Sequence, residues 1–223
     1  MNVLLINPSL IEADIKHYSK SIEKNRGVYP PLGLSYVASS LINAGHFVKI
    51  IDCDLEENPT ERILREVRDI DYDLVGFYVM TWTFNEASDI LKIIKKIRPN
   101  IKAVFGGPNA SSLPQVSLEI SDFDYVVVGE GEDAIIELIK AIENKIPFEL
   151  IDGILYRDKD NKIIQNPSRQ FKDNIDKISF PAWELLKVGR YHDVFTRYNK
   201  FATMIASRGC PFNCTFCDRK NRM

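Results

Sequence analysis

Three of the four cysteines of this 223-residue chain lie in one short stretch near its carboxyl end. Cys210, Cys214 and Cys217 have the spacing C-x3-C-x2-C, which lets three sulfur atoms converge on one centre. Thiolates are the ligands that zinc, copper(I) and iron–sulfur clusters select. A structural zinc site or an inert cluster takes four protein ligands. Three cysteines therefore predict a metal centre with one coordination position left for another molecule.

The residues around the cysteines resemble a known family. Phe216 directly precedes the last cysteine, and the apolar run Phe201–Ala206 precedes the first. This pattern is similar to the cluster loop of radical S-adenosylmethionine (radical SAM) enzymes. In that family three cysteines hold a [4Fe-4S] cluster whose fourth iron binds S-adenosylmethionine, and an electron from the cluster cleaves that molecule to give a carbon radical. The resemblance implies that the three cysteines are cluster ligands and that an electron donor is a partner.

Two other uses of the cysteines stay open. Asp218 or His192 could complete a zinc site, since carboxylate and imidazole both bind zinc. A disulfide is disfavoured by the compartment that the sequence predicts. The apolar run Met1–Ile6 has no basic segment before it, so no signal peptide is expected, and no apolar run approaches the roughly 20 residues that span a bilayer. We therefore expect a cytoplasmic protein, in which thiols stay reduced.

The composition limits the classes of partner that we expect for the chain. Hydrophobic residues make up 45 % of it, which is enough for a folded core. The formal net charge of −2 gives no basic surface for nucleic acid or for an anionic membrane. We expect a small-molecule or metabolite substrate, and neither nucleic acid nor a membrane as a partner.

Short apolar runs alternate with helical patterns over residues 1–146. Between the runs, apolar residues recur every three or four positions, as in the helix that contains Leu34, Val37 and Leu41. This helix is expected to start in the segment Val28–Leu32 and to stop at Gly45. Five strand-then-helix units with almost continuous apolar strands predict a doubly wound, Rossmann-like or flavodoxin-like α/β domain with a parallel five-stranded sheet. The runs predicted as strands are Asn2–Ile6, Phe47–Ile51, Leu74–Val79, Ala103–Phe105 and Tyr125–Val128.

Ligands of such sheets bind beyond the carboxyl ends of the strands, so the loops there carry the candidate site. Paired glycines let backbone N–H groups approach a ligand closely, and a phosphate could bind near Gly106 and Gly107. The carboxylates of Glu130 and Glu132 would repel phosphate and are expected to accept hydrogen bonds from ribose hydroxyls or amides. Alternatively, the glycines only turn the chain, and the glutamates are there because the dipole of the following helix stabilises their negative charge. The candidate binding residues are Thr81, Trp82, Thr83, Gly106, Gly107, Pro108, Asn109, Gly129, Glu130, Gly131 and Glu132.

The order of these motifs is similar to that in the cobalamin-binding subfamily of radical SAM proteins. The resemblance covers essentially the whole chain and implies a first domain that holds cobalamin at its strand ends, with the corrin ring facing the radical SAM barrel. By position it places Thr81–Thr83 near the lower corrin face, and Gly106–Asn109 with Gly129–Glu132 along the nucleotide tail. The motifs that carry the resemblance are Tyr29–Leu34, Gly45–Val48, Asp73–Gly76, Gly106–Pro108 and Gly129–Glu132, followed by the cysteine loop.

One motif of many cobalamin proteins is missing from the sequence. Those proteins carry Asp-x-His-x-x-Gly after the first strand, and its histidine binds cobalt. The segment Ser9–Gly27 contains His17 but not that motif. We therefore expect cobalamin without a histidine axial ligand.

The remainder of the chain is predicted to form two further parts. Residues 147–200 are expected to form a β-hairpin and a linker, with Trp183 packed between domains. Residues 201–223 are expected to form the first strand and the cluster loop of a radical SAM barrel whose other residues are missing. We expect the first domain to fold alone, the cysteine loop to be disordered or misplaced without its supporting sheet, and such a fragment to be inactive.

These features predict the amino-terminal, cobalamin-binding fragment of a radical SAM oxidoreductase or methyltransferase, with methyl transfer as the expected reaction. A methylthiotransferase that modifies transfer RNA is disfavoured, because such enzymes carry extra cysteines in their first domain and only Cys53 lies outside the cluster loop here. The non-enzyme alternative is a cobalamin-binding or nucleotide-binding sensor module whose cysteines hold zinc. A third alternative is a domain that keeps the fold and binds nothing.

Overall fold

A computed structural model describes residues 1–9, 27–195, 201–210, 212 and 214–217 of the chain. The predictions that concern His17, Asp218 and most of the segment Ser9–Gly27 lie outside the described residues. Among the helices of the described part, none is long and apolar enough to cross a membrane.

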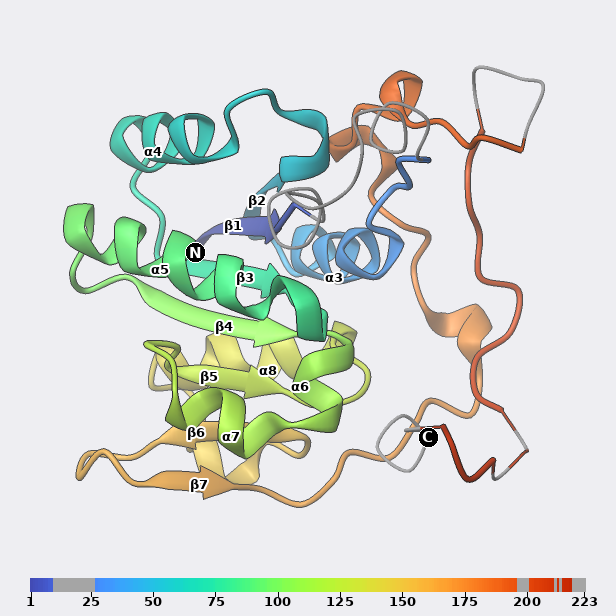
Figure 1. Cartoon of the computed structure of the whole chain (residues 1–223). Helices are drawn as coiled ribbons and strands as arrows, with labels where there is room; N and C mark the ends of the chain where they lie inside the picture. The colour runs from blue at the N-terminus through green and yellow to red at the C-terminus, as the bar shows by residue number, and fades with distance from the viewer. Residues whose placement is uncertain (10–26, 196–200, 211, 213, 218–223) are drawn as a thin grey trace.

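One mixed sheet runs through the described part of the chain, with the strand order β2-β1-β3-β4-β5-β6-β7 (Figure 1). Side chains alternate along its strands, so that Leu4 is buried on one face and Val3 and Leu5 on the other. The α/β class and the five predicted strands are confirmed. The parallel strands are β1 (Asn2–Asn7), β2 (Phe47–Asp52), β3 (Leu74–Tyr78), β4 (Lys102–Gly106) and β5 (Tyr125–Val127).

The predicted number of five strands needs correction, because the hairpin extends the same sheet. β6 (Ile154–Arg157) pairs antiparallel with β5, and β7 (Ile163–Gln165) pairs antiparallel with β6. Without the hairpin, β5 would present a row of unpaired backbone groups at the sheet edge. The hairpin covers that edge, and the sheet has seven strands in the described residues.

Helices cover both faces of the sheet, as parallel strands require. Buried side chains of α3 and α8 pack with Leu5 and Val104 on one face. Those of α4 and α5 pack on the other face with Phe105 and Phe123, whose ring centroids are 4.8 Å apart. The helices in the described residues are α3 (Leu32–Asn43), α4 (Pro59–Asp69), α5 (Phe84–Ile97), α6 (Pro108–Ser112), α7 (Pro114–Glu119) and α8 (Glu132–Ile142).

The ends of α3 have clear causes in the sequence. Gly45, with a φ of +83°, reverses the chain after the last turn, which confirms the predicted stop. The helix begins at Leu32 and not at Val28, because residues that precede the prolines at positions 30 and 31 disfavour the helical region. Val28 instead exchanges backbone hydrogen bonds of 2.8 and 3.0 Å with His192.

Two short helices, α6 and α7, follow β4, where a strand-then-helix unit was predicted without bounds for its helix. Each begins with a proline, Pro108 or Pro114, where the missing N–H costs nothing. Their five and six residues are too few to show a helical period in the sequence. They place Ala110 and Leu118 in the core and thereby fix the backbone that follows β4.

The connector after the hairpin returns along the side of the sheet toward which the parallel strands point (Figure 1). The amide of Ala182 donates a hydrogen bond of 3.0 Å to the carbonyl of Ser35 in α3. Trp183, partly buried, packs against a small cluster that contains Leu186 and Tyr191. The connector is therefore attached to α3, and it carries the residues after position 200 back to the strand ends. Its 3-10 turns are Ile175–Lys177, Trp183–Leu185 and Val188–Arg190.

Candidate functional site

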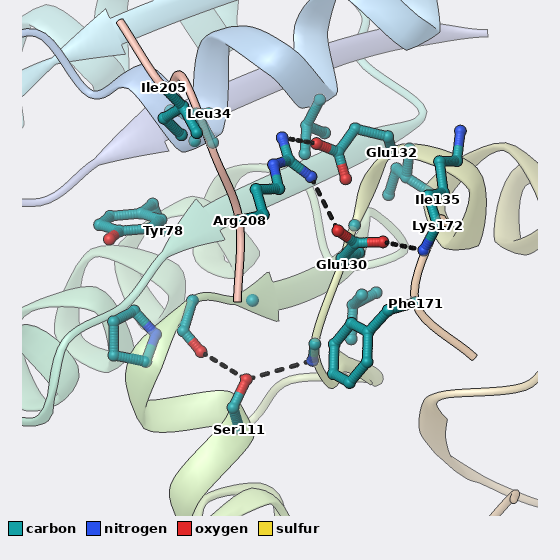
Figure 2. A pocket seen from close by; sticks show the side chains of 18 of the residues that line it. Leu34, Tyr78, Ser111, Glu130, Glu132, Ile135, Phe171, Lys172, Ile205 and Arg208 are labelled. Atoms are coloured by element: carbon teal, nitrogen blue, oxygen red, sulfur yellow. Dashed lines mark hydrogen bonds and ion pairs between the residues drawn. The ribbon is translucent and has the colours of Figure 1, made fainter. Parts of the chain in front are cut away.

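A cavity of about 1280 Å³ lies at the carboxyl ends of β1, β3, β4 and β5, on the face that α3 and α8 cover. Its volume exceeds the roughly 300–1,000 Å³ of most small-ligand pockets, so it suits a large ligand. Apolar side chains of the two helices, such as Leu34 and Ile135, form one wall. Phe171, Ile205 and Arg208, from segments far along the chain, also line the cavity (Figure 2). Parallel α/β sheets bind their ligands at this position.

Glycines leave room on the sheet side of the cavity, which the side chains of Leu5, Val104 and Val127 also line. A Cβ atom on Gly76 would lie 2.8 Å from Leu5 Cδ2, and one on Gly131 would lie 3.1 Å from Val37 Cγ2. Gly107 has a φ of +101°, which side chains rarely tolerate. At these glycines the cavity presents backbone to a ligand beside apolar strand side chains, and the residues present fit a large flat group such as the corrin ring of cobalamin.

Seven of the eleven predicted binding residues line this cavity: Gly106, Gly107, Pro108, Gly129, Glu130, Gly131 and Glu132. They come from two loops that are distant in sequence. The sheet brings these loops together because β4 and β5 are parallel neighbours.

The other four predicted binding residues are not among the lining residues. Thr83 is buried, and its hydroxyl accepts from the amide of Met80 at 3.0 Å, while Trp82 is half exposed. The turn Thr81–Thr83 leads into α5, which covers the opposite face of the sheet, so the chain turns away from the cavity there. Asn109 is also buried, and its amide donates to Ser117 Oγ at 2.8 Å. Their contacts with cobalamin stay a prediction.

The structure adds cavity residues that the sequence reasoning missed. Ser111 Oγ lies 3.2 Å from the carbonyl of Gly107, to which it donates, and accepts from the amide of Gly129 at 3.1 Å (Figure 2). The loops after β4 and β5 are thereby tied together. The available signal was the serine four residues after Gly107, a spacing that places its hydroxyl over the preceding turn.

The acidic loop after β5 pairs with cations of its own chain. Glu130 and Glu132 accept from the two terminal nitrogens of Arg208 at 3.1 and 2.5 Å. Glu130 also accepts from the amide of Lys172 at 3.1 Å. Burial by itself would lower the pKa of Arg208, but hydrogen bonds with Glu132 and Glu130 raise it overall, so the guanidinium stays charged. The acceptors predicted for ribose hydroxyls or amides are therefore occupied here by the protein itself.

The three cysteines of the predicted cluster are exposed, and none forms a disulfide. Cys210 lines the edge of the cavity, and the amide of Cys217 donates to the carbonyl of Cys214 at 3.2 Å, which makes a turn. Across the described residues, no three His, Cys, Asp or Glu side chains lie close enough together to hold a metal ion. The cysteines fit an iron–sulfur cluster by their chemistry and spacing, and this arrangement does not bring their sulfur atoms to one centre.

A second polar cluster lies at the carboxyl ends of β1 and β2. The buried carboxylate of Asp52 accepts from Asn7 Nδ2 and from the Tyr191 hydroxyl, each at 2.9 Å, and from the amide of Asp54 at 3.2 Å. Burial raises the pKa of Asp52, and the hydrogen bonds from Asn7 and Tyr191 partly oppose that shift. Tyr191 thereby fastens the connector to the sheet.

Replacement Tyr191→Phe is expected to lower the free energy of unfolding by about 1–3 kcal/mol at pH 7, because a buried acceptor loses its donor. The pKa of Asp52 in the folded state is already raised, so its stabilising contribution is lost as the pH rises through that value. The variant raises the pKa further, and its cost should be smaller at pH 4 than at pH 7. Urea unfolding at both pH values measures this.

The control is Tyr29→Phe, which removes the 2.8 Å hydrogen bond from an exposed tyrosine to Asp193. It should change stability little at either pH. An equal cost of Tyr191→Phe at pH 4 and pH 7 would contradict the role given to Asp52.

Comparison with known proteins agrees with the site. Residues 20–139 match the B12 binding domain family. The chain is 35 % identical to an uncharacterized methyltransferase of Pyrococcus horikoshii over 84 % of its own length and 40 % of the relative. It is 29 % identical to the anaerobic magnesium-protoporphyrin IX monomethyl ester cyclase of Rubrivivax gelatinosus over 98 % of its length and 39 % of the relative. The chain thus spans about two fifths of these relatives.

A solved structure has the same fold. The apo form of the cobalamin-dependent S-adenosylmethionine radical enzyme OxsB is similar with a TM-score of 0.72 and 21 % identity, over 100 % of this chain and 29 % of that one. The resemblance to cobalamin-binding radical SAM proteins, predicted from the motifs, is confirmed by these relatives. With a match that spans more than half of its residues, the chain belongs to the B12-binding domain family.

Proposed function

We propose that this chain is the cobalamin-binding part of an enzyme that uses cobalamin, a [4Fe-4S] cluster and S-adenosylmethionine to transfer a methyl group to a small-molecule substrate. The observation that carries the proposal is the composition of the cavity wall. The glycine-rich loops after β4 and β5 line the cavity, and residues 207–210, which lead into the cysteine loop, line it too. The glycine-rich loops and the segment before the cysteines therefore line the same cavity.

Cobalamin would supply a cobalt centre that carries a methyl group, and the cluster with S-adenosylmethionine would supply a radical. Residues of this chain would bind cobalamin and shield it from solvent. Gly106, Gly107 and Gly129 line the cavity and would let the ligand approach their backbone, and Leu34 and Ile135 would exclude water from its apolar side. The missing Asp-x-His-x-x-Gly motif supports binding without a histidine ligand on cobalt.

The cluster is the second part of the proposal. Cys210, Cys214 and Cys217 would each supply one thiolate, and they must come closer together than in the described arrangement. An electron donor would reduce the cluster. Methyl transfer is proposed because a relative that matches over most of this chain is named a methyltransferase.

Metal analysis of the full-length protein, purified without oxygen and reconstituted with iron and sulfide, tests the proposal. We expect about four iron and four sulfide ions per chain. Replacement of Cys210, Cys214 and Cys217 by alanine should remove the iron and leave a bound corrinoid spectrum in place. The matched control is Cys53→Ala, which alters a buried cysteine after β2 and should keep both.

Zinc at about one ion per chain with no iron or sulfide would contradict the enzyme and favour a sensor module. Iron without any corrinoid spectrum would contradict the cobalamin part of the proposal alone.

A further inference from the structure

An arginine from the segment before the cysteines lies at the rim of the cavity. Arg208 Nη1 is 3.1 Å from Glu130 Oε1, and Nη2 is 2.5 Å from Glu132 Oε1 (Figure 2). The guanidinium also lies over the ring of Tyr36 in α3, 5.1 Å from its centroid. One side chain thereby joins the segment 201–210 to α3 and to the start of α8.

These contacts differ from ordinary surface ion pairs because they are shielded from solvent. The side chains of Glu130, Glu132 and Arg208 are 15 %, 6 % and 21 % exposed. Two neighbouring carboxylates with so little solvent repel each other unless a cation lies between them. Glu132 is the first residue of α8, where the helix dipole further favours its charge. The acidic loop therefore forms a site that a cation from the chain itself fills.

The position of Arg208 limits the position of the first cysteine. Only Gly209 separates Arg208 from Cys210, so their Cα atoms are at most about 7 Å apart. Gly209 has a φ of +87°, a turn that a residue with a side chain would not make easily. Cys210 lines the cavity as a result. An arginine held by two carboxylates thus holds the first cysteine at the rim.

We propose that Arg208 is a positioning residue that docks the cysteine segment onto Glu130 and Glu132 and so sets the place of Cys210 beside the bound cobalamin. The docking itself involves only residues of this chain. Its meaning for catalysis rests on the proposed function, in which Cys210 is a cluster ligand and the cavity holds cobalamin.

The test is the mobility of a nitroxide attached to Cys210. The chain for labelling carries Cys53→Ala, Cys214→Ala and Cys217→Ala, so that Cys210 is its one thiol. In this chain we expect a label with restricted motion in the electron paramagnetic resonance spectrum. Arg208→Gln should shorten the rotational correlation time of the label by about three- to tenfold, because an undocked segment moves on the nanosecond timescale.

Two further variants separate docking from general stability. Exchange of both Glu130 and Glu132 for glutamine should mobilise the label as much as Arg208→Gln does, and the combined variant should add little. Arg208→Lys should restore part of the restriction, since lysine keeps the charge but not the fork that reaches two carboxylates. The matched control is Lys172→Gln, which breaks the 2.9 Å ion pair between Lys172 of the connector and Asp133 of α8 and should leave the label restricted.

The proposal is overturned if Arg208→Gln leaves the label as restricted as before, or if Lys172→Gln mobilises it equally. Circular dichroism of each variant tests whether the fold is kept. Hydroxocobalamin binding is measured on the same samples by equilibrium dialysis. If the chain that keeps Arg208 does not bind hydroxocobalamin, the proposed function is contradicted. The mobility of the label still tests the docking in that case.

Discussion

Replacement Gly106→Val is expected to weaken the binding of hydroxocobalamin by at least about tenfold, which corresponds to about 1.4 kcal/mol, while the melting temperature changes little. Gly106 is the last residue of β4, and it lies on the same face of the sheet as Val104; both line the cavity. A Cβ atom on Gly106 would lie 3.7 Å from the carbonyl oxygen of Val127, an ordinary contact. The Cβ atom itself therefore meets no clash in the fold, and the larger side chain is expected to occupy space that the ligand needs.

The matched control for this experiment is Gly189→Val. Gly189 lies in the connector, outside the residues that line the cavity, and a Cβ atom there would have no neighbour within 4 Å. This variant should bind hydroxocobalamin as tightly as the unmodified chain. If Gly106→Val also kept its full affinity, cobalamin would not lie over the end of β4.

Replacement of the neighbouring glycine, Gly107→Ala, is expected to act on stability, with a loss of about 2–4 kcal/mol in the free energy of unfolding. Gly107 has a φ of +101° and a ψ of −167°, a region that only glycine occupies freely. An added Cβ would lie 3.0 Å from the carbonyl oxygen of Val79 and 3.1 Å from the ring of Tyr78. That carbonyl accepts from the amide of Asn109 at 3.0 Å, so a shift would also disturb the start of α6.

Gly45→Ala separates the two causes of this loss. Gly45 also has a positive φ, +83°, but an added Cβ there would meet nothing within 4 Å. Its cost should be limited to the backbone strain of about 1–2 kcal/mol. Urea unfolding of both variants measures the difference. If Gly107→Ala lowers the free energy of unfolding no more than Gly45→Ala does, the close approach of the added Cβ to Val79 does not contribute to the loss.

The fold could be predicted from sequence where the information was local. The apolar runs marked each parallel strand, and Gly45 marked the end of α3, because a strand core and a left-handed turn each depend on a few adjacent residues. The hairpin that forms β6 and β7 was also predicted. Its pairing with β5 was not, since the choice of an edge partner depends on which edge remains uncovered.

The parts of the candidate site that could be predicted are the loops whose positions are determined by the sheet alone. The loops that begin at Gly106 and Gly129 meet because their strands are parallel neighbours. The turn Thr81–Thr83 also follows a strand, but the helix after it lies on the other face, and strand order alone does not decide that. Arg208 and Phe171 come from segments without any period. Charge complementarity with Glu130 was the one available signal for Arg208, and it does not specify a distance.

The central claim is that the cavity at the strand ends holds cobalamin, and equilibrium dialysis of this chain against hydroxocobalamin tests it most directly. We predict saturable binding of about one cobalamin per chain, weakened in Gly106→Val and unchanged in Gly189→Val. A chain that is folded by circular dichroism and binds no hydroxocobalamin, or that binds it equally well after Gly106→Val, would contradict the claim.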